Sequence, residues 1–582
     1  MDFKRLRRLD SRLHTDASSV VSNAQSRLAL VVAALCGAFM LSVALRLSGP
    51  TINPDEWGFL TNGQVLIGHS EAALPTAGSF YPAGYGIVTG LGALLTGSMS
   101  GSYRFALLTN VVLAVAVSWY AGRLARREFN VSQNMARLIS ALVFVVPGTI
   151  VSAMFSWAET ASRLAFLVFV GCVLRATKQK MPHIVIGLGL FTGLMPALHG
   201  RFMLLLPIVC LLFIWWWLRK EITFVVSLIA VVTTSFGYEL SHLLNRFVKT
   251  TVYEKSFNQE SRLLGRLFNP GVWPALIRTM VGQSWYLIAS SCGLFAVALF
   301  FIVSRIRSDG GRQTIGNDPE RMTFLVVLIG AFAIIFTGGL QLLYGDRGDH
   351  LIYGRYVEML VPALLMISCI GLERGAKLAR RSWLFGGVSI IAISILYVVI
   401  DMGDGVRDRA QQGNIVYPNI VGIDIAHYVV HPGLISFGLL FMIFALVLWA
   451  ISLRNTSVAI LALVVALAVG SVYSGQESVM SRTGRLDQTN QTVQLVKDSG
   501  TARVGFDIEV RNDRSYYYMR YKLHPIRVVR FNISGPSARI PKIFSCVYGL
   551  PNKPPSDGQW AIVANEDAVG RVLWQRAGTA HC

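Results

Sequence analysis

Two adjacent carboxylates, Asp55 and Glu56, are the residues of this sequence best suited to chemistry. They stand in the segment Asn53–Trp57, directly after the first long apolar stretch. Neighbouring carboxylates at a membrane surface repel each other and lose hydration, so a metal ion, a basic group or a proton should offset them. We predict that both serve catalysis, with Asp55 as a general base. The alternative is a helix that begins after Pro54, where acidic side chains favour the helix dipole.

Two short turns between later apolar stretches carry further candidate residues. Glu159 ends the turn 156–159, where it could act as a second catalytic residue or only cap a helix. Asp55 and Glu159 together could also hold a divalent cation, with oxygen ligands suited to Mg²⁺, Mn²⁺ or Ca²⁺. His199 and Arg201 occupy the second turn, where they could contact a phosphate or anchor a lipid headgroup.

The segment 345–358 opens a late apolar stretch and contains Tyr353, Arg355 and Glu358. Arg355 and Glu358 stand three residues apart, so on a helix they share a face and are expected to form an ion pair. Arg355 would keep spare donors for a phosphate. We predict that Tyr353 and Arg355 bind a donor phosphate, as does Arg262 in a basic and aromatic loop; a structural ion pair and attraction to anionic headgroups are the alternatives.

The elements that must position these residues are membrane-spanning helices. Of the 582 residues, 53% are apolar and only 15% are charged, whereas soluble proteins average about 25% charged residues. This composition excludes a soluble enzyme. Apolar stretches of about 20 residues predict thirteen spans, at about 28–47, 104–122, 138–155, 160–175, 183–198, 202–218, 222–240, 285–304, 323–343, 357–372, 384–400, 433–452 and 456–474.

Basic residues determine the predicted orientation. Clusters of Lys and Arg fall in alternate loops, which places those loops and residues 1–27 in the cytoplasm. The membrane domain then covers 28–474, with a first external loop at 48–103 that contains one or two interfacial helices, and a fourth external loop at 241–284. The net charge of +21 arises largely from these cytoplasmic loops, so we predict no nucleic-acid partner.

The tail 475–582 is predicted to form a small external α/β domain. Its periodicity indicates a helix near 488–499, a strand at 504–510, a helix at 513–523, and strands at 527–531 and 560–565. Five of the seven cysteines fall in predicted spans. The other two, Cys546 and Cys582, are expected to form a disulfide in an oxidising compartment.

The first external loop resembles that of the GT-C superfamily of membrane glycosyltransferases. The resemblance rests on Pro54-Asp55-Glu56, followed by Tyr81-Pro82-Ala83-Gly84-Tyr85-Gly86 and an apolar interfacial stretch. The superfamily includes protein O-mannosyltransferases, aminoarabinose transferases of lipid A and mycobacterial arabinofuranosyltransferases. The resemblance implies a polytopic helical membrane fold, a polyprenyl-phosphate sugar donor and catalysis by the first-loop acidic residue. A second acidic residue in the turn of Glu159 and an Arg-Tyr element such as Arg355-Tyr356 also fit that family.

These observations predict an inverting glycosyltransferase that moves one sugar from a polyprenyl-phosphate donor to a cell-envelope glycan, lipid or protein. The expected location is a bacterial plasma membrane, among membrane lipids, with the active site on the extracytoplasmic face and a role in cell-wall biogenesis. The alternatives are a transporter or flippase of lipid-linked saccharides, a ligase or polymerase with the same type of donor, and a receptor with an external sensor. The sequence does not distinguish arabinose, mannose or another sugar.

Overall fold

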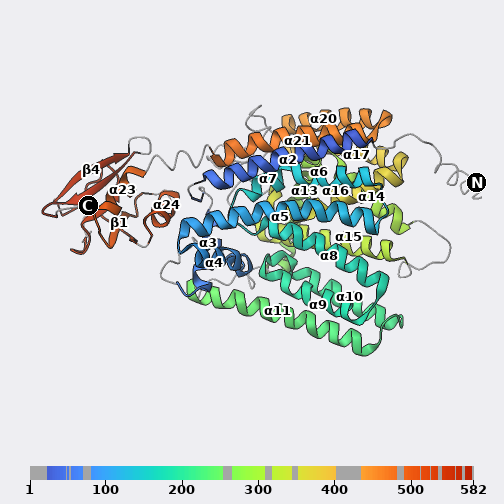
Figure 1. The fold of residues 1–582 in the computed structure, drawn as a ribbon, viewed down its shortest axis with the longest axis horizontal. Coiled ribbons are helices and arrows are strands. Elements are labelled where there is room, and N and C mark those ends of the chain that lie inside the picture. Colours follow the sequence, from blue (N-terminus) through green and yellow to red (C-terminus); the bar gives the residue numbers. More distant parts are fainter. Residues whose placement is uncertain are drawn as a thin grey trace, which may run out of the picture.

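The computed structural model has two parts, a large helical bundle and a small α/β domain at one end of it (Figure 1). It describes residues 22–579 apart from gaps at 48, 51–53, 70–79, 253–264, 308–317, 344–351, 401–433, 481–489, 511–512, 525, 535–539, 558 and 567–569. α3 and α4 lie at the end of the bundle beside the α/β domain (Figure 1).

The bundle consists of α-helices joined by short 3-10 turns (labelled η). The elements up to residue 252 are α2 (Asn23–Arg46), α3 (Pro54–Leu66), η2 (Ala83–Tyr85), α4 (Gly86–Thr96), α5 (Met99–Glu128), α6 (Gln133–Val145), α7 (Pro147–Ala153), α8 (Glu159–Gln179), α9 (Pro182–Leu194), η3 (Met195–Ala197), η4 (Gly200–Leu204), α10 (Leu205–Leu218) and α11 (Phe224–Val252). Those that follow are η5 (Pro270–Val272), α13 (Trp273–Ser290), α14 (Leu294–Arg307), α15 (Pro319–Leu342), η8 (Gly354–Tyr356), η9 (Glu358–Leu360), α16 (Val361–Arg374), α17 (Ala376–Ile400), α20 (Leu434–Arg454) and α21 (Thr456–Gly475).

Several helices are long and apolar enough to cross a membrane. Among the described residues there are 8 such helices, or up to 10 if each of two bent helix pairs counts as one span. All thirteen predicted spans contain helix, but some of these helices are shorter than a bilayer requires, such as Pro182–Ala197. The chain is a multi-pass membrane protein, and the number thirteen stays a prediction.

Two of the predicted spans are broken helices. α6 and α7 meet at 51°, because Pro147 has no backbone N–H and forces Val146 into an extended conformation, with ψ 132°. α13 and α14 meet at 108°. Here the Gly293 N–H donates to the Ile288 carbonyl at 2.8 Å, and Cys292 and Gly293 have φ values of 49° and 87°. This Schellman-type ending stops α13, so the region of the predicted span 285–304 contains a bent pair of helices, and a single span there stays a prediction.

The long predicted loop at 241–284 is helical at both ends. α11 continues to Val252 and α13 begins at Trp273. No glycine or proline follows Gly237 within α11, so nothing in its sequence ends the helix at residue 240. The region 48–103, which was predicted to be the first external loop, contains α3 and α4, where one or two helices were expected.

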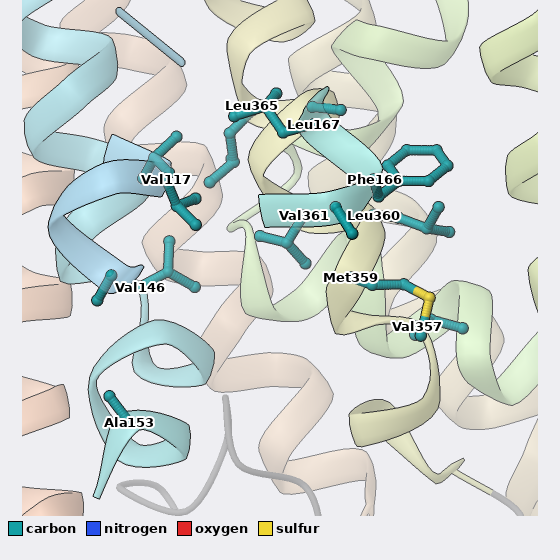
Figure 2. Packing of buried hydrophobic residues seen from close by; sticks show 14 of the residues in the cluster. Val117, Val146, Ala153, Phe166, Leu167, Val357, Met359, Leu360, Val361 and Leu365 are labelled. Carbon is teal, nitrogen blue, oxygen red and sulfur yellow. The ribbon is translucent and has the colours of Figure 1, made fainter. Parts of the chain in front are cut away.

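Buried apolar side chains from several helices form one continuous core in the bundle. Figure 2 shows Phe166 and Leu167 of α8 close to Leu360, Val361 and Leu365 of η9 and α16. Val357 and Met359 belong to the same cluster and are buried. Dispersion in such close packing stabilises helix association inside a membrane, where lipid tails remove most of the hydrophobic driving force. The core therefore fixes the segment that carries Arg355 and Glu358.

α9 and α11 approach each other through small residues. A Cβ atom added to Gly193 would lie 2.2 Å from the backbone oxygen of Thr234, and one added to Gly237 would lie 2.8 Å from that of Leu190. The Ser241 hydroxyl also donates to the Gly193 carbonyl at 3.0 Å. Small residues permit this approach of the two backbones. The contact fixes the end of α9, from which the chain enters the turn that carries His199.

The α/β domain contains one mixed five-stranded sheet. Its elements are α23 (Asn490–Asp498), β1 (Arg503–Asp507), α24 (Asp513–Leu523), β2 (Arg527–Phe531), β3 (Cys546–Gly549), β4 (Trp560–Glu566) and β5 (Arg571–Arg576). The strand order is β2-β1-β3-β5-β4, with β1 parallel to β2 and β3, and β5 antiparallel to β3 and β4. A helix and strands were predicted at the positions of α24, β1, β2 and β4, whereas β3 and β5 were missed.

Replacing Gly193 by alanine is expected to lower the free energy of unfolding by about 2 kcal/mol, because overpacking a tight contact typically costs about 1–3 kcal/mol. The midpoint of thermal unfolding in detergent measures the effect. Gly187→Ala in the same helix is the matched control, since a Cβ atom there meets nothing within 4 Å. Equal midpoints for the two variants would contradict the close contact between α9 and α11.

Candidate functional site

Asp55 lies in the first turn of α3, which begins at Pro54 as the sequence indicated. Its carboxylate forms an ion pair with Arg355 and accepts a hydrogen bond from the Tyr81 hydroxyl at 2.6 Å. Tyr81 is itself fixed, because the Asn62 side-chain amide donates to the Tyr81 carbonyl at 2.9 Å. Asp55 keeps about a fifth of its side chain exposed, so it remains accessible beside these partners.

Glu56 points away from Asp55 and joins α3 to the turn before α8. It is fully buried and accepts hydrogen bonds from the Ser156 backbone N–H at 2.9 Å and the Ser156 hydroxyl at 3.3 Å. A buried carboxylate needs such donors. The geometry therefore gives Glu56 a role in fixing the position of α3, and contact with a substrate stays a prediction.

Arg355 is the residue on which the site converges. Its guanidinium group forms ion pairs with both Asp55 and Glu159, and its Cζ atom lies 3.9 Å from the centroid of the Trp157 ring. Trp157 stacks in turn on Phe155, with 4.3 Å between ring centroids. A planar guanidinium group suits this combination of two carboxylates and an aromatic face. The site thus joins elements that are far apart in the sequence.

The expected ion pair between Arg355 and Glu358 does not form. The segment folds as two separate 3-10 turns, η8 and η9, with Val357 between them at φ −114° and ψ −3°. A continuous helix would be needed to bring side chains three residues apart onto one face. Arg355 therefore faces Asp55 and Glu159, while Glu358 faces the interior of the bundle.

Glu358 belongs to a second buried charge cluster. It forms an ion pair with Arg163 and accepts a hydrogen bond from the Tyr286 hydroxyl at 2.5 Å. Ser152 lies beside the pair and contacts both residues, since its hydroxyl oxygen accepts from Arg163 at 3.1 Å and its hydroxyl donates to Glu358 at 3.5 Å. A Cβ atom on Gly148 would lie 2.7 Å from a Glu358 carboxylate oxygen, so the broken helix at Pro147 leaves room for the pair only with glycine there.

The two charge clusters join the same two segments of chain. α8 contributes Glu159 and, four residues later, Arg163, while η8 and η9 contribute Arg355 and, three residues later, Glu358. The order of acid and base is opposite on the two segments, so each buried charge meets its counter-charge. Such pairing is needed because an unpaired buried charge costs several kcal/mol.

His199 and Arg201 lie beside this arrangement. The Arg201 guanidinium group contacts the His199 Nε2 atom at 2.8 Å and lies 3.1 Å from the centroid of the Tyr356 ring. Burial, with Arg201 and then Arg355 nearby, lowers the pKa of His199 well below its usual value. His199 is therefore neutral and can accept from Arg201. Tyr353 packs against Tyr356 at 4.6 Å between ring centroids.

Several buried polar atoms in this region have no hydrogen-bond partner among the described residues, and two of them belong to charged residues predicted to bind the substrate. These two are the Nε atom of Arg201 and the Oε2 atom of Glu159. Buried polar groups are normally satisfied, so these atoms are candidates for contact with a substrate. One is a cationic donor and the other an anionic acceptor, which suits a ligand that carries both a phosphate and hydroxyl groups.

Three predictions are not tested by this geometry. Arg262 and Cys582 lie outside the described residues; Cys546 in β3 is disulfide-bonded, and its pairing with Cys582 stays a prediction. Asp55 and Glu159, the expected cation ligands, already share the guanidinium group of Arg355. No cluster of three His, Cys, Asp or Glu side chains forms within the described part of the chain. A divalent cation at Asp55 and Glu159 therefore stays a prediction.

The structure brings most of the predicted site residues together and adds others. Asp55, Glu159 and Arg355 are in direct contact, and His199, Arg201 and Tyr353 adjoin them through Tyr356. The sequence assigned no role to Tyr81, Trp157 or Arg163. Arg163 could have been noticed, because a cation inside an apolar stretch is functional or paired. The contacts of Tyr81 and Trp157 left no comparable signal in the sequence.

Two solved structures of ArnT from Cupriavidus metallidurans are similar to this chain. The structure of ArnT in the apo state has a TM-score of 0.50 and 14% sequence identity, over 95% of this chain and 98% of that one. The structure of ArnT bound to undecaprenyl phosphate has a TM-score of 0.51 and 14% identity, over 95% and 99% of the two chains. No protein-family model and no curated protein sequence matches the chain.

The likeness to ArnT extends over nearly the whole of both chains, so it includes the α/β domain as well as the bundle. It confirms the predicted fold class, a helical polytopic membrane protein with a small α/β domain after it. At 14% identity the comparison concerns the fold. The chain therefore has the same overall fold as ArnT.

Proposed function

We propose that this protein is a membrane glycosyltransferase that moves a single sugar from a polyprenyl-phosphate donor to an acceptor of the cell envelope. The observation that carries the proposal is the contact of one buried guanidinium group, that of Arg355, with two carboxylates at one end of a GT-C fold. This combination offers a base for an acceptor hydroxyl and a cation for a leaving phosphate. The reaction would take place on the extracytoplasmic face of a bacterial plasma membrane.

The donor phosphate would bind between Arg355 and Arg201. ArnT of the same fold has been solved with undecaprenyl phosphate bound, which supports a polyprenyl-phosphate ligand here. Both guanidinium groups are buried, where a charge-assisted hydrogen bond to phosphate is stronger than in water. A phosphate would compete with Asp55 for the donors of Arg355, so donor binding would release the Asp55 carboxylate for catalysis.

Asp55 would then act as the general base. It would take the proton of the acceptor hydroxyl while the acceptor oxygen forms a bond to the anomeric carbon of the sugar. The bond from that carbon to the phosphate oxygen breaks, and Arg355 with Arg201 stabilises the negative charge on the departing polyprenyl phosphate. One direct displacement inverts the anomeric centre. Tyr81, which donates to Asp55 at 2.6 Å, would hold the carboxylate in the orientation that accepts the proton.

A transporter of lipid-linked saccharides is the main competing function. Transporters place their ionisable residues near the middle of the membrane. Here Arg355 meets Glu159 and Asp55 at the first turn of α3, a helix that lies at the end of the bundle beside the α/β domain (Figure 1). A ligase or polymerase would use the same phosphate contacts but transfer whole oligosaccharides. The length of the transferred saccharide distinguishes it from the proposed enzyme.

Asp55→Asn is expected to reduce transfer at least about 100-fold, because general-base catalysis contributes about 10²–10⁴-fold. The assay measures release of polyprenyl phosphate and labelling of acceptor from a panel of radiolabelled polyprenyl-phosphate sugars that includes arabinose and mannose. Glu373→Gln is the matched control, since Glu373 is exposed and accepts from the Ser132 backbone N–H far from the site. Movement of labelled lipid between leaflets without consumption of any donor would instead establish a transporter.

Arg355→Lys is expected to reduce kcat/KM for the donor about 10–100-fold, mainly through a higher KM. A lysine keeps the charge but cannot contact both carboxylates and a phosphate with a planar group, and a hydrogen bond to a charged group contributes about 1.5–3 kcal/mol. Steady-state kinetics with varied donor concentration measure the effect. Arg305→Lys, in a partly exposed ion-pair cluster with Asp318 and Glu320, is the control. An unchanged KM would remove Arg355 from donor binding.

Glu358→Gln is expected to lower the thermal stability sharply, because it leaves Arg163 buried and unpaired at a cost of about 3–5 kcal/mol. The double variant Arg163→Gln with Glu358→Gln should be more stable than the single variant, since it removes both charges. The midpoint of thermal unfolding in detergent gives the comparison. If the double variant is less stable by the sum of the two single losses, the ion pair does not couple α8 to η9.

A further inference from the structure

The first turn of α3 is fixed by three consecutive side chains, each with a different partner. Asp55 contacts Arg355, and Glu56 accepts from Ser156. Trp57, the third, contacts Tyr521 of the α/β domain with 5.5 Å between ring centroids and 78° between ring planes. Trp57 is almost fully buried. The residue next to the catalytic pair therefore depends on a domain that the membrane bundle does not itself contain.

Tyr521 fills a confined space at the end of the bundle. Its side chain is buried, and its ring lies edge-on to Tyr103 of α5 at 6.4 Å between centroids. A Cβ atom on Gly49 would lie only 2.6 Å from the Tyr521 ring, so the loop after α2 has room for the ring only with glycine there. Aromatic pairs in such edge-to-face contact stabilise by about 0.5–1.5 kcal/mol beyond their buried area.

Tyr521 reaches the bundle from α24, which lies on the side of the α/β domain that faces α3 (Figure 1). At the other end of α24, Tyr516 packs on Phe506 of β1 with 5.2 Å between ring centroids. The single helix α24 therefore makes one aromatic contact with the sheet and a second with the end of the bundle that contains α3. A shift of the α/β domain would move Tyr521 and the space beside Trp57.

α3 needs such external contacts. It has 13 residues, and isolated helices of this length are only marginally stable in water. Its position follows from the side chains packed against it, and at Trp57, the residue after Asp55 and Glu56, the packed side chain comes from outside the bundle. Misplacement of a catalytic group by about 1 Å can reduce a rate about 100-fold.

We propose that Tyr521 is a positioning residue: by packing between Gly49, Trp57 and Tyr103 it fixes the first turn of α3, and thereby holds Asp55 in register with Arg355. This inference rests on the proposed glycosyltransferase function for its kinetic consequence. The α/β domain then takes part in catalysis without touching the donor. A domain that only binds acceptor would affect the acceptor KM instead.

The test compares Tyr521→Ala, Tyr521→Phe and Gly49→Ala in the full-length protein in detergent. Gly49→Ala reaches the same contact from the bundle, because the added methyl group must displace the Tyr521 ring. Gly187→Ala is its matched control, since a methyl group there meets nothing within 4 Å. Hydrogen exchange of the α3 amides over residues 58–66 is measured together with kcat and the donor and acceptor KM values, and exchange in β1 and β3 reports on the α/β domain.

Tyr521→Ala and Gly49→Ala are both expected to speed exchange in α3 at least about tenfold and to lower kcat about 10–100-fold, with both KM values within about twofold. Tyr521→Phe should restore both readouts, because the ring and not the hydroxyl fills the space. If Tyr521→Ala also speeds exchange in β1 and β3, the α/β domain itself has unfolded. The result for Gly49→Ala then decides whether the contact positions α3. Unchanged α3 exchange in Gly49→Ala, or a change in the acceptor KM alone, would overturn the proposal. Hydrogen exchange gives its answer even if the wild type transfers no sugar, so failure of the proposed function is recognised separately.

Discussion

The ion pairs of Arg355 with Asp55 and Glu159 are the interaction on which the rest of the site depends. The partners are separated by 300 and 196 residues in the sequence, so they meet only if the helices that carry them are correctly placed. A charge in this buried position is tolerated only with its counter-charges in contact. The 3-10 turns at Arg355, the short helix α3 and the start of α8 can all be understood as the means by which three charged side chains reach one point.

Much of the fold could be predicted because a membrane restricts the possible structures. Apolar stretches had to be helices, and the helix start at Pro54 followed from proline and two acidic residues in the first turn. The candidate residues Asp55, Glu159 and Arg355 could be identified because charged residues beside membrane-spanning stretches are costly unless they are paired or functional. Their pairing could not be predicted, because it depends on the break at Val357 that turns Arg355 and Glu358 in different directions.

Other features were missed for reasons that are equally physical. The bend between α13 and α14 arises from left-handed backbone at Cys292, a residue that rarely adopts that conformation. β3 has only four residues, all buried in the centre of the sheet, so it lacks the alternation that indicates a strand with one exposed face. Arg163 was overlooked because its partner Glu358 was assigned to Arg355. With Glu358 paired wrongly, the charge cluster of Arg163 and Glu358 could not be predicted.

The packing of Tyr521 beside Trp57 has a consequence for how the protein is made. α3 is synthesised early, whereas α24 is synthesised late, and domains generally fold in the order in which they leave the ribosome. The aromatic contact can form only after the α/β domain has folded. With the proposed role of Tyr521, nascent chains and products of premature termination that lack α24 would hold Asp55 loosely, so activity would arise only once α24 is in place.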